Sequence, residues 1–96
     1  MMIVIAYDIA TKDAAGKKRL QRISGKCAKW GIAVQNSVYE CEMNAEQYRT
    51  LKSELEEIFC SEADSIRIYR LGNHYRGRIE VLGRDAVTWD RDTYVI

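Results

Sequence analysis

The chain has 96 residues, 47% of them apolar, which is enough for one domain with its own core and excludes a disordered chain. Its 15 basic and 14 acidic residues give a net charge of +1, so total charge alone identifies no class of partner. We expect no signal peptide and no membrane anchor, because the apolar N-terminal run is short and lacks a basic leader. Three dispersed cysteines without a C-x-x-C pair predict a reducing, cytoplasmic location with no disulfide and no zinc: Cys27, Cys41 and Cys60.

The first predicted element is a strand over residues 2–7, a continuous apolar run typical of burial on both faces. Asp8 follows this run and Ile9 continues it, so a carboxylate stands inside an apolar segment. Such a group is usually paired, hydrogen-bonded or bound to a metal. Asp8 is therefore a candidate site residue, and the alternative is an ordinary salt bridge with a nearby base such as Lys12.

Residues 13–31 predict an amphipathic helix, with Thr11 or Asp13 as its cap and Gly31 as its end. The apolar stripe of this helix consists of Leu20, Ile23, Cys27 and Trp30. A separate basic stripe consists of Lys18, Arg22, Lys26 and Lys29, with Arg19 beside it. The stripe is either a solvated helix face or a ridge that faces phosphates, and few acidic partners are available for i,i+4 pairs.

Residues 32–43 predict extended structure with a change of side-chain parity between residues 37 and 39. A parity change requires a bulge, a bend or a tight turn, so one kinked strand and a hairpin both remain open. Ser37 is a candidate for phosphate contact or for closing a turn through its hydroxyl. Tyr39 either stacks on a base or packs at an interface, and packing is favoured because aromatic residues usually serve burial first.

The second helix is predicted from residue 44, where Asn44 and Gln47 resemble a capping box; its apolar face runs to Phe59 and its acidic outer side to Glu62. A strand over residues 65–71 follows and ends at Gly72, and residues 79–82 predict a further short strand. Residues 94–96 form an apolar end to the chain. We expect one domain over residues 1–82 and a tail over residues 83–96 that contacts a second copy or another partner.

This order predicts an α+β, ferredoxin-like βαββαβ sandwich with an extra C-terminal strand. Two helices cover only one face of such a sheet, yet the first strand is apolar on both parities. A second copy packed sheet to sheet is the simplest cover for the other face, so we expect a homodimer.

Four segments in register resemble the small CRISPR-associated adaptation nuclease family, the lesser of the two proteins that most CRISPR systems share. The resemblance runs from residue 2 to about residue 82. The segments are Tyr7-Asp8-Ile9, Lys18-Arg19-Leu20, residues 34–41 after Gly31, and residues 64–72.

The resemblance implies a homodimeric, magnesium-dependent endonuclease on DNA or RNA that acts with the larger integrase in CRISPR spacer acquisition. It implies that Asp8 is the catalytic and metal-binding residue, with one magnesium ion shared across the dimer axis. The family often has a basic residue where this chain has Ala33, so any contact from that position is in doubt.

A competing hypothesis is a non-catalytic adaptor that binds duplex DNA and bridges integrase dimers, for which Asp8 is dispensable. A third is an RNA-cleaving toxin on the same fold. The nucleic-acid-binding candidates are the basic residues of the first helix and of the loop after the last long strand: Lys18, Arg19, Arg22, Lys26, Arg76 and Arg78.

Overall fold

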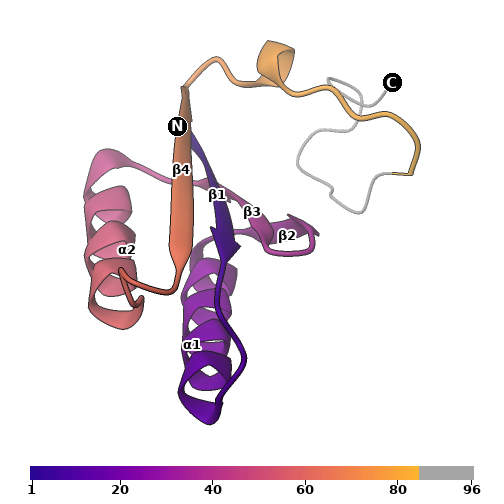
Figure 1. Cartoon of the computed structure of the whole chain (residues 1–96). Helices are drawn as coiled ribbons and strands as arrows, with labels where there is room; N and C mark the ends of the chain where they lie inside the picture. Colours follow the sequence, from indigo (N-terminus) through magenta and orange to yellow (C-terminus); the bar gives the residue numbers. More distant parts are fainter. Residues whose placement is uncertain (85–96) are drawn as a thin grey trace.

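The computed structural model describes residues 1–84, which form an antiparallel four-stranded sheet with two helices on one of its faces (Figure 1). The order of strands in the sheet is β2-β3-β1-β4. The elements are β1 (Met2–Asp8), α1 (Ala14–Trp30), β2 (Ile32–Gln35), β3 (Val38–Glu42), α2 (Ala45–Ile58) and β4 (Ser65–Gly72). The predicted ferredoxin-like βαββαβ fold is confirmed.

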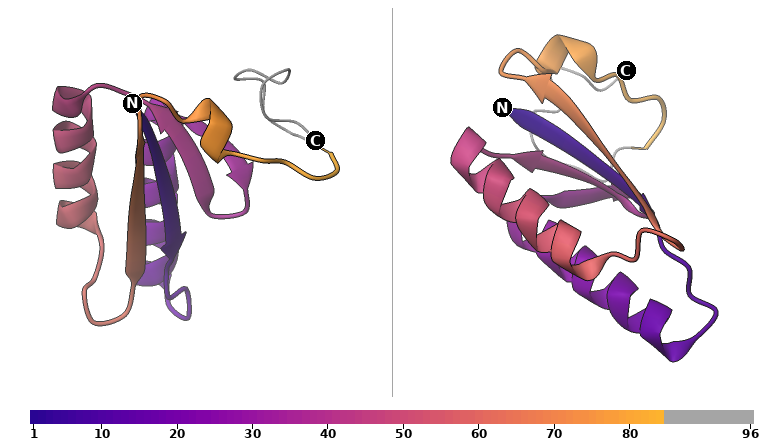
Figure 2. Two further views of the ribbon diagram at one scale, coloured as in Figure 1. Left: turned by 90° about the horizontal axis from the view of Figure 1, so that it is seen from above. Right: turned by 60° about the vertical axis from the view of Figure 1, so that its left-hand side comes forward.

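The central strand β1 sends alternate side chains to the two faces of the sheet. Ile3, Ile5 and Tyr7 belong to the buried core cluster that the sheet shares with the helices. Met2, Val4 and Ala6 have the opposite parity; Met2 is fully buried, whereas Val4 and Ala6 are only half-buried. Both helices lie on the same side (Figure 2), so the face that carries Val4 and Ala6 is the bare one.

Both helices begin at predicted capping residues and α1 ends before Gly31, whereas α2 ends at Ile58 and so does not include Glu62. The Asp13 side chain accepts a hydrogen bond from the Gly16 backbone at 2.8 Å, which makes Asp13 the cap of α1 rather than Thr11. Asn44 and Gln47 form a reciprocal capping box at the start of α2. Leu51, Leu55 and Ile58 of α2 are buried in the core, as the periodicity predicts.

Residues 32–42 form a hairpin, which resolves the alternatives that the parity change leaves open. Gln35 of β2 pairs with Val38 of β3, and Asn36 and Ser37 make the turn between them. Ser37 has a φ of 63°, in the left-handed region that tight turns often use. Its carbonyl accepts a hydrogen bond from the Tyr7 backbone at 3.0 Å, so the turn is tied to the end of β1.

A buried ion pair joins the start of β4 to α1 and to the loop after β1. The Asp64 carboxylate is fully buried and accepts from Arg19 Nε at 2.7 Å and from Arg19 Nη2 at 3.2 Å. It also accepts from the backbone N–H groups of Ala10 at 3.1 Å and of Cys60 at 2.9 Å. Each carboxylate oxygen therefore has two donors, which satisfies the charge that folding removes from water.

The chain leaves the sheet after β4. Gly72 has a φ of 79°, and a 3₁₀ helix follows at Arg76–Arg78 (Figure 1). The strand predicted over residues 79–82 does not form in the described part of the chain, where only Val81 makes an isolated bridge. An extended segment becomes a strand only beside a free sheet edge, and this one turns away from β4. Residues 85–96, including the predicted apolar end, lie outside the described residues.

Neither described helix is long and apolar enough to cross a bilayer.

We predict that Gly31→Ala destabilises the protein and that Gly25→Ala does not. A Cβ atom at Gly31 collides with the Glu40 carbonyl and with Cys41 Sγ, whereas a Cβ at Gly25 in α1 meets no atom within 4 Å. Overpacking at Gly31 should cost about 1–3 kcal/mol, and Gly25→Ala should stabilise α1 by roughly 0.5–1 kcal/mol. Chemical denaturation of both variants measures the difference, and equal midpoints contradict the packing argument.

We also predict an acid-labile contribution to stability from Asp64. The Arg19 guanidinium, followed by the Cys60 and Ala10 backbone N–H groups, lowers the pKa of Asp64 to about 2 against the opposing effect of desolvation. A carboxyl whose pKa is lower in the folded state stabilises the fold above its unfolded pKa of 3.8 and loses this contribution as the pH falls toward 2.

Asp64→Asn should therefore be less stable at pH 7 by roughly 3 kcal/mol and should show a smaller loss of stability between pH 4 and pH 2. Urea unfolding across this range tests the prediction. Glu57→Gln, at an exposed position of α2, is the control that should keep the wild-type pH dependence. Parallel pH curves for Asp64→Asn and wild type would count against the assignment.

Candidate functional site

Asp8 is the last residue of β1, is exposed, and lies on the bare face of the sheet because it alternates with buried Tyr7. Its cross-strand neighbour is Ser65 of β4. Within residues 1–84 the ion pairs are those of the N-terminus with Glu42, Arg19 with Asp64, and Lys26 with Glu54. The alternative of a salt bridge between Asp8 and Lys12 is therefore not realised in the described structure.

A single copy supplies few oxygen ligands around Asp8. The described residues contain no cluster of three or more His, Cys, Asp or Glu side chains that could hold a metal ion. An exposed carboxylate beside a serine hydroxyl is an oxygen donor set, and such donors suit magnesium, which retains several waters and uses only one or two carboxylates. Asp8 and Ser65 therefore fit one part of an oxygen-ligand set for magnesium.

Arg67 also lies on the bare face, because it pairs with Ala6, which has the same parity as Asp8. Its Nε donates to Tyr69 Oη at 2.6 Å, and its guanidinium carbon lies 5.5 Å from the centre of the Tyr69 ring. Sequence analysis did not single out Arg67 as a site residue. Only the register that aligns Arg67 with Ala6 places it on the face of Asp8.

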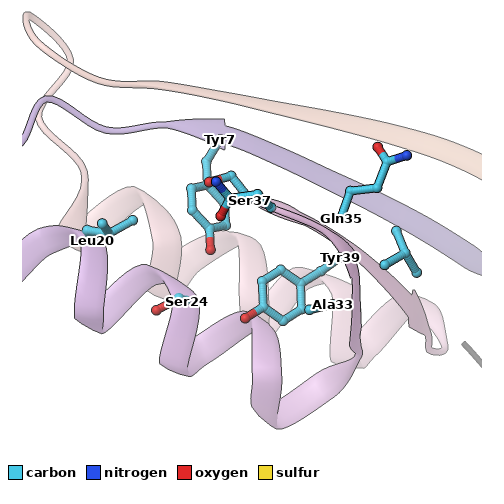
Figure 3. A pocket seen from close by; sticks show the side chains of 9 residues that line it. Tyr7, Leu20, Ser24, Ala33, Gln35, Ser37 and Tyr39 are labelled. Carbon is cyan, nitrogen blue, oxygen red and sulfur yellow. The ribbon is translucent and has the colours of Figure 1, made fainter. Parts of the chain in front are cut away.

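Tyr39 lies on the other face of the sheet. Its ring stacks on Tyr7 with centroids 6.2 Å apart, and the two rings line a pocket of about 490 Å³ against α1 (Figure 3). Burial, with Tyr39 as a lesser cause, raises the pKa of Tyr7 to about 12, so this hydroxyl keeps its proton at neutral pH. The pocket does not include Asp8, and Tyr39 packs against the core cluster of its own chain, so its placement at an interface stays a prediction.

Ser37 contributes to the turn through its backbone. Its left-handed φ and its carbonyl bond to Tyr7 place it beside the end of β1. The structure thus brings Ser37 near the strand end that carries Asp8, and the described bond comes from the main chain rather than from the hydroxyl.

The basic residues of α1 divide into two groups. Arg19 is held by buried Asp64, and Lys26 Nζ lies 2.8 Å from Glu54 Oε2 of α2. Lys18 and Arg22 are exposed and take part in none of the ion pairs found within residues 1–84. Of the four nucleic-acid-binding candidates on α1, Lys18 and Arg22 are therefore the two that are available to an anionic partner, together with exposed Lys17 and Lys29.

Arg76 and Arg78 lie beyond the opposite end of the sheet from Asp8. Asp8 pairs with Ser65, the first residue of β4, whereas both arginines follow Gly72, the last residue of that strand. A strand of this length spans roughly 20–25 Å. In one copy of the chain, these two arginines and Asp8 therefore cannot contact the same phosphate.

Comparison with known proteins gives matches over most of the chain. The family model described as CRISPR associated protein Cas2 matches residues 1–79. The CRISPR-associated endonuclease Cas2 of Halalkalibacterium halodurans is 43% identical over 83 residues, which is 86% of each chain. The CRISPR-associated endoribonuclease Cas2 1 of Moorella thermoacetica is 41% identical over 83 residues, again 86% of each chain.

A solved structure agrees with these sequence matches. The crystal structure of Streptococcus pyogenes Cas2 at pH 6.5 superposes with a TM-score of 0.74 at 40% identity, covering 86% of this chain and 100% of that one. The match includes β1 with Asp8 and extends through β4 with Ser65 and Arg67. The chain belongs to the Cas2 family of CRISPR-associated proteins.

Proposed function

We propose that this protein is a magnesium-dependent endonuclease on DNA or RNA that works as a homodimer with the CRISPR integrase in spacer acquisition. The observation that carries the proposal is the placement of Asp8. It is exposed at a fixed strand end, and none of the ion pairs within residues 1–84 involves it. The names of the relatives, endonuclease and endoribonuclease, support the reaction class. Three free cysteines fit a reducing, cytoplasmic setting.

The bare face of the sheet supports the homodimer. Val4, Ala6 and Val38 are only half-buried there, and Tyr69 is 44% exposed. Apolar surface of this kind is favourably covered by an identical surface, since a two-fold axis places the same patch on both copies. A two-fold axis near the ends of the two β1 strands would bring both Asp8 carboxylates to one site.

Three side chains of this face would have separate roles in phosphodiester hydrolysis. When bound at Asp8, magnesium supplies charge neutralisation at the scissile phosphate and a bound water of lowered pKa. Asp8 would hold the ion, and the Ser65 hydroxyl beside it would be suited to orient a ligand water. Arg67 uses Nε for Tyr69, which leaves its terminal nitrogens as donors for a phosphate oxygen.

A second candidate function is a non-catalytic DNA adaptor that bridges integrase dimers. The observation that favours it is the exposure of Lys18 and Arg22 on α1, in the helix layer on the opposite side of the sheet from Asp8. Duplex DNA bound along α1 need not reach Asp8. The two functions are compatible in one molecule because they use different faces.

We predict that Asp8→Asn abolishes metal-dependent cleavage while leaving the fold intact. The exposed amide should change the free energy of unfolding by less than about 0.5 kcal/mol. Loss of a direct ligand should slow cleavage by more than the roughly ten- to hundredfold typical of outer-shell partners. The measurement compares duplex DNA and single-stranded RNA, each with magnesium and with chelator, and Glu57→Gln is the matched exposed-acid control. Equal cutting by wild type and Asp8→Asn would refute the nuclease.

We predict that the double variant Lys18→Glu, Arg22→Glu weakens duplex DNA binding and makes it less dependent on salt. Losing two phosphate contacts should reduce the slope of log affinity against log salt by about 2. The double variant Arg49→Glu, Lys52→Glu makes the same change of charge on α2 and should bind like wild type. Equal weakening by both double variants would mean that total charge, and not the surface of α1, governs binding.

A further inference from the structure

Asp64 is a buried carboxylate that bonds the chain two residues after the proposed metal-binding residue, and the proposed mechanism does not use it. We propose that Asp64, together with Arg19, is a positioning residue that holds Asp8 in place for metal binding. The inference rests on the proposed function, because it explains how Asp8 is held for the metal binding proposed there.

Asp64 is linked to two segments beside Asp8, the chain that follows β1 and the start of β4. Its Oδ1 accepts from the backbone N–H of Ala10, two residues after Asp8. Ser65, the residue directly after Asp64, is the cross-strand neighbour of Asp8. The carboxylate thus bonds the segment that leaves β1, and its own residue directly precedes the cross-strand neighbour of Asp8.

The end of β1 needs such an anchor because its sheet pairing stops at Asp8. The Tyr7 backbone N–H donates a hydrogen bond to the Ser37 carbonyl at 3.0 Å, and Asp8 is the last β1 residue that pairs with β4. The ends of secondary-structure elements open more readily than their centres. The bond to Ala10 fixes the chain just past this end, where opening would start.

Arg19 orients the Asp64 carboxylate. Its guanidinium donates from Nε and Nη2 to the two carboxylate oxygens, a bidentate geometry that leaves the carboxylate little freedom to rotate. The carboxylate also accepts a hydrogen bond from the Cys60 backbone N–H at 2.9 Å. Arg19 thus acts on Asp8 through Asp64 and needs no contact with nucleic acid.

The alternative is that the ion pair serves stability alone, and the chain provides a matched control for that case. Lys26 and Glu54 also form an ion pair between α1 and a later element, at 2.8 Å, but they join α1 to α2, away from the end of β1. Both pairs tie α1 to the rest of the fold. Only the Asp64 pair also bonds the segment that follows Asp8.

The experiment compares Asp64→Asn with Glu54→Gln in the full chain, well below the melting temperature of each. Cleavage is measured against magnesium concentration, and magnesium binding is measured separately by calorimetry. For Asp64→Asn we expect magnesium affinity to fall by roughly ten- to hundredfold, the range typical of residues that orient metal ligands. Glu54→Gln should keep the wild-type magnesium dependence even if its melting temperature also falls.

Amide hydrogen exchange provides a readout that does not depend on activity. Asp64→Asn should accelerate exchange in residues 8–12 while α2 keeps its protection, whereas a loss of global stability would accelerate exchange throughout the core. If Asp64→Asn fails to fold, Arg19→Lys takes its place. It preserves the charge but removes the bidentate geometry, and it should show the same changes in weaker form.

The outcomes separate this inference from the proposed function. Magnesium-dependent cleavage by wild type, with an unchanged magnesium response in folded Asp64→Asn, overturns the positioning role and leaves the nuclease intact. Unchanged exchange in residues 8–12 overturns it as well. Equal cutting by wild type and Asp8→Asn refutes the nuclease itself, and the positioning role falls with it. A lowered magnesium affinity together with exchange that rises only in residues 8–12 supports both.

Discussion

The alternation of side chains along β1 is the constraint on which the rest of the structure depends. A strand with helices on one face must send every second side chain into the core, and Ile3, Ile5 and Tyr7 fill those positions. Asp8 therefore points to the face that the helices leave bare. The same parity keeps the stacked tyrosines and their pocket away from Asp8, so this pocket and the proposed metal site lie on different faces of the sheet.

The internal ion pairs determine which cations remain available at the surface. Burying Asp64 without a partner would be costly, so the fold surrounds it with Arg19 and two backbone N–H groups. Lys26 pairs with Glu54 in the contact between the two helices. A basic stripe that appears uniform in the sequence thus consists of structural cations, which hold the layers together, and exposed cations, which can meet an anionic partner.

Local signals predicted most of the fold. Asp13 and Gly31 bound α1, the Asn44–Gln47 capping box begins α2, and the apolar stripes of both helices enter the core. The parity change at residues 37–39 indicated a break but could not distinguish a bend from a hairpin, because both change parity. The strand predicted over residues 79–82 is absent from the described chain, since strand formation depends on a free neighbouring edge and not on local pattern alone.

By itself, the sequence determined the two helices, the two long strands and the carboxylate at the end of the first strand, because these follow from periodicity and capping chemistry, and four of its segments resembled those of the family. Only the tertiary structure decided that Asp8 takes part in none of the ion pairs within residues 1–84, that Arg67 shares its face, and that Asp64 bonds the segment after it. These facts depend on strand register and on contacts between residues as far apart as Arg19 and Asp64. Side chains distant in sequence come into contact only when the helices pack on the sheet. Local sequence patterns therefore do not predict these contacts.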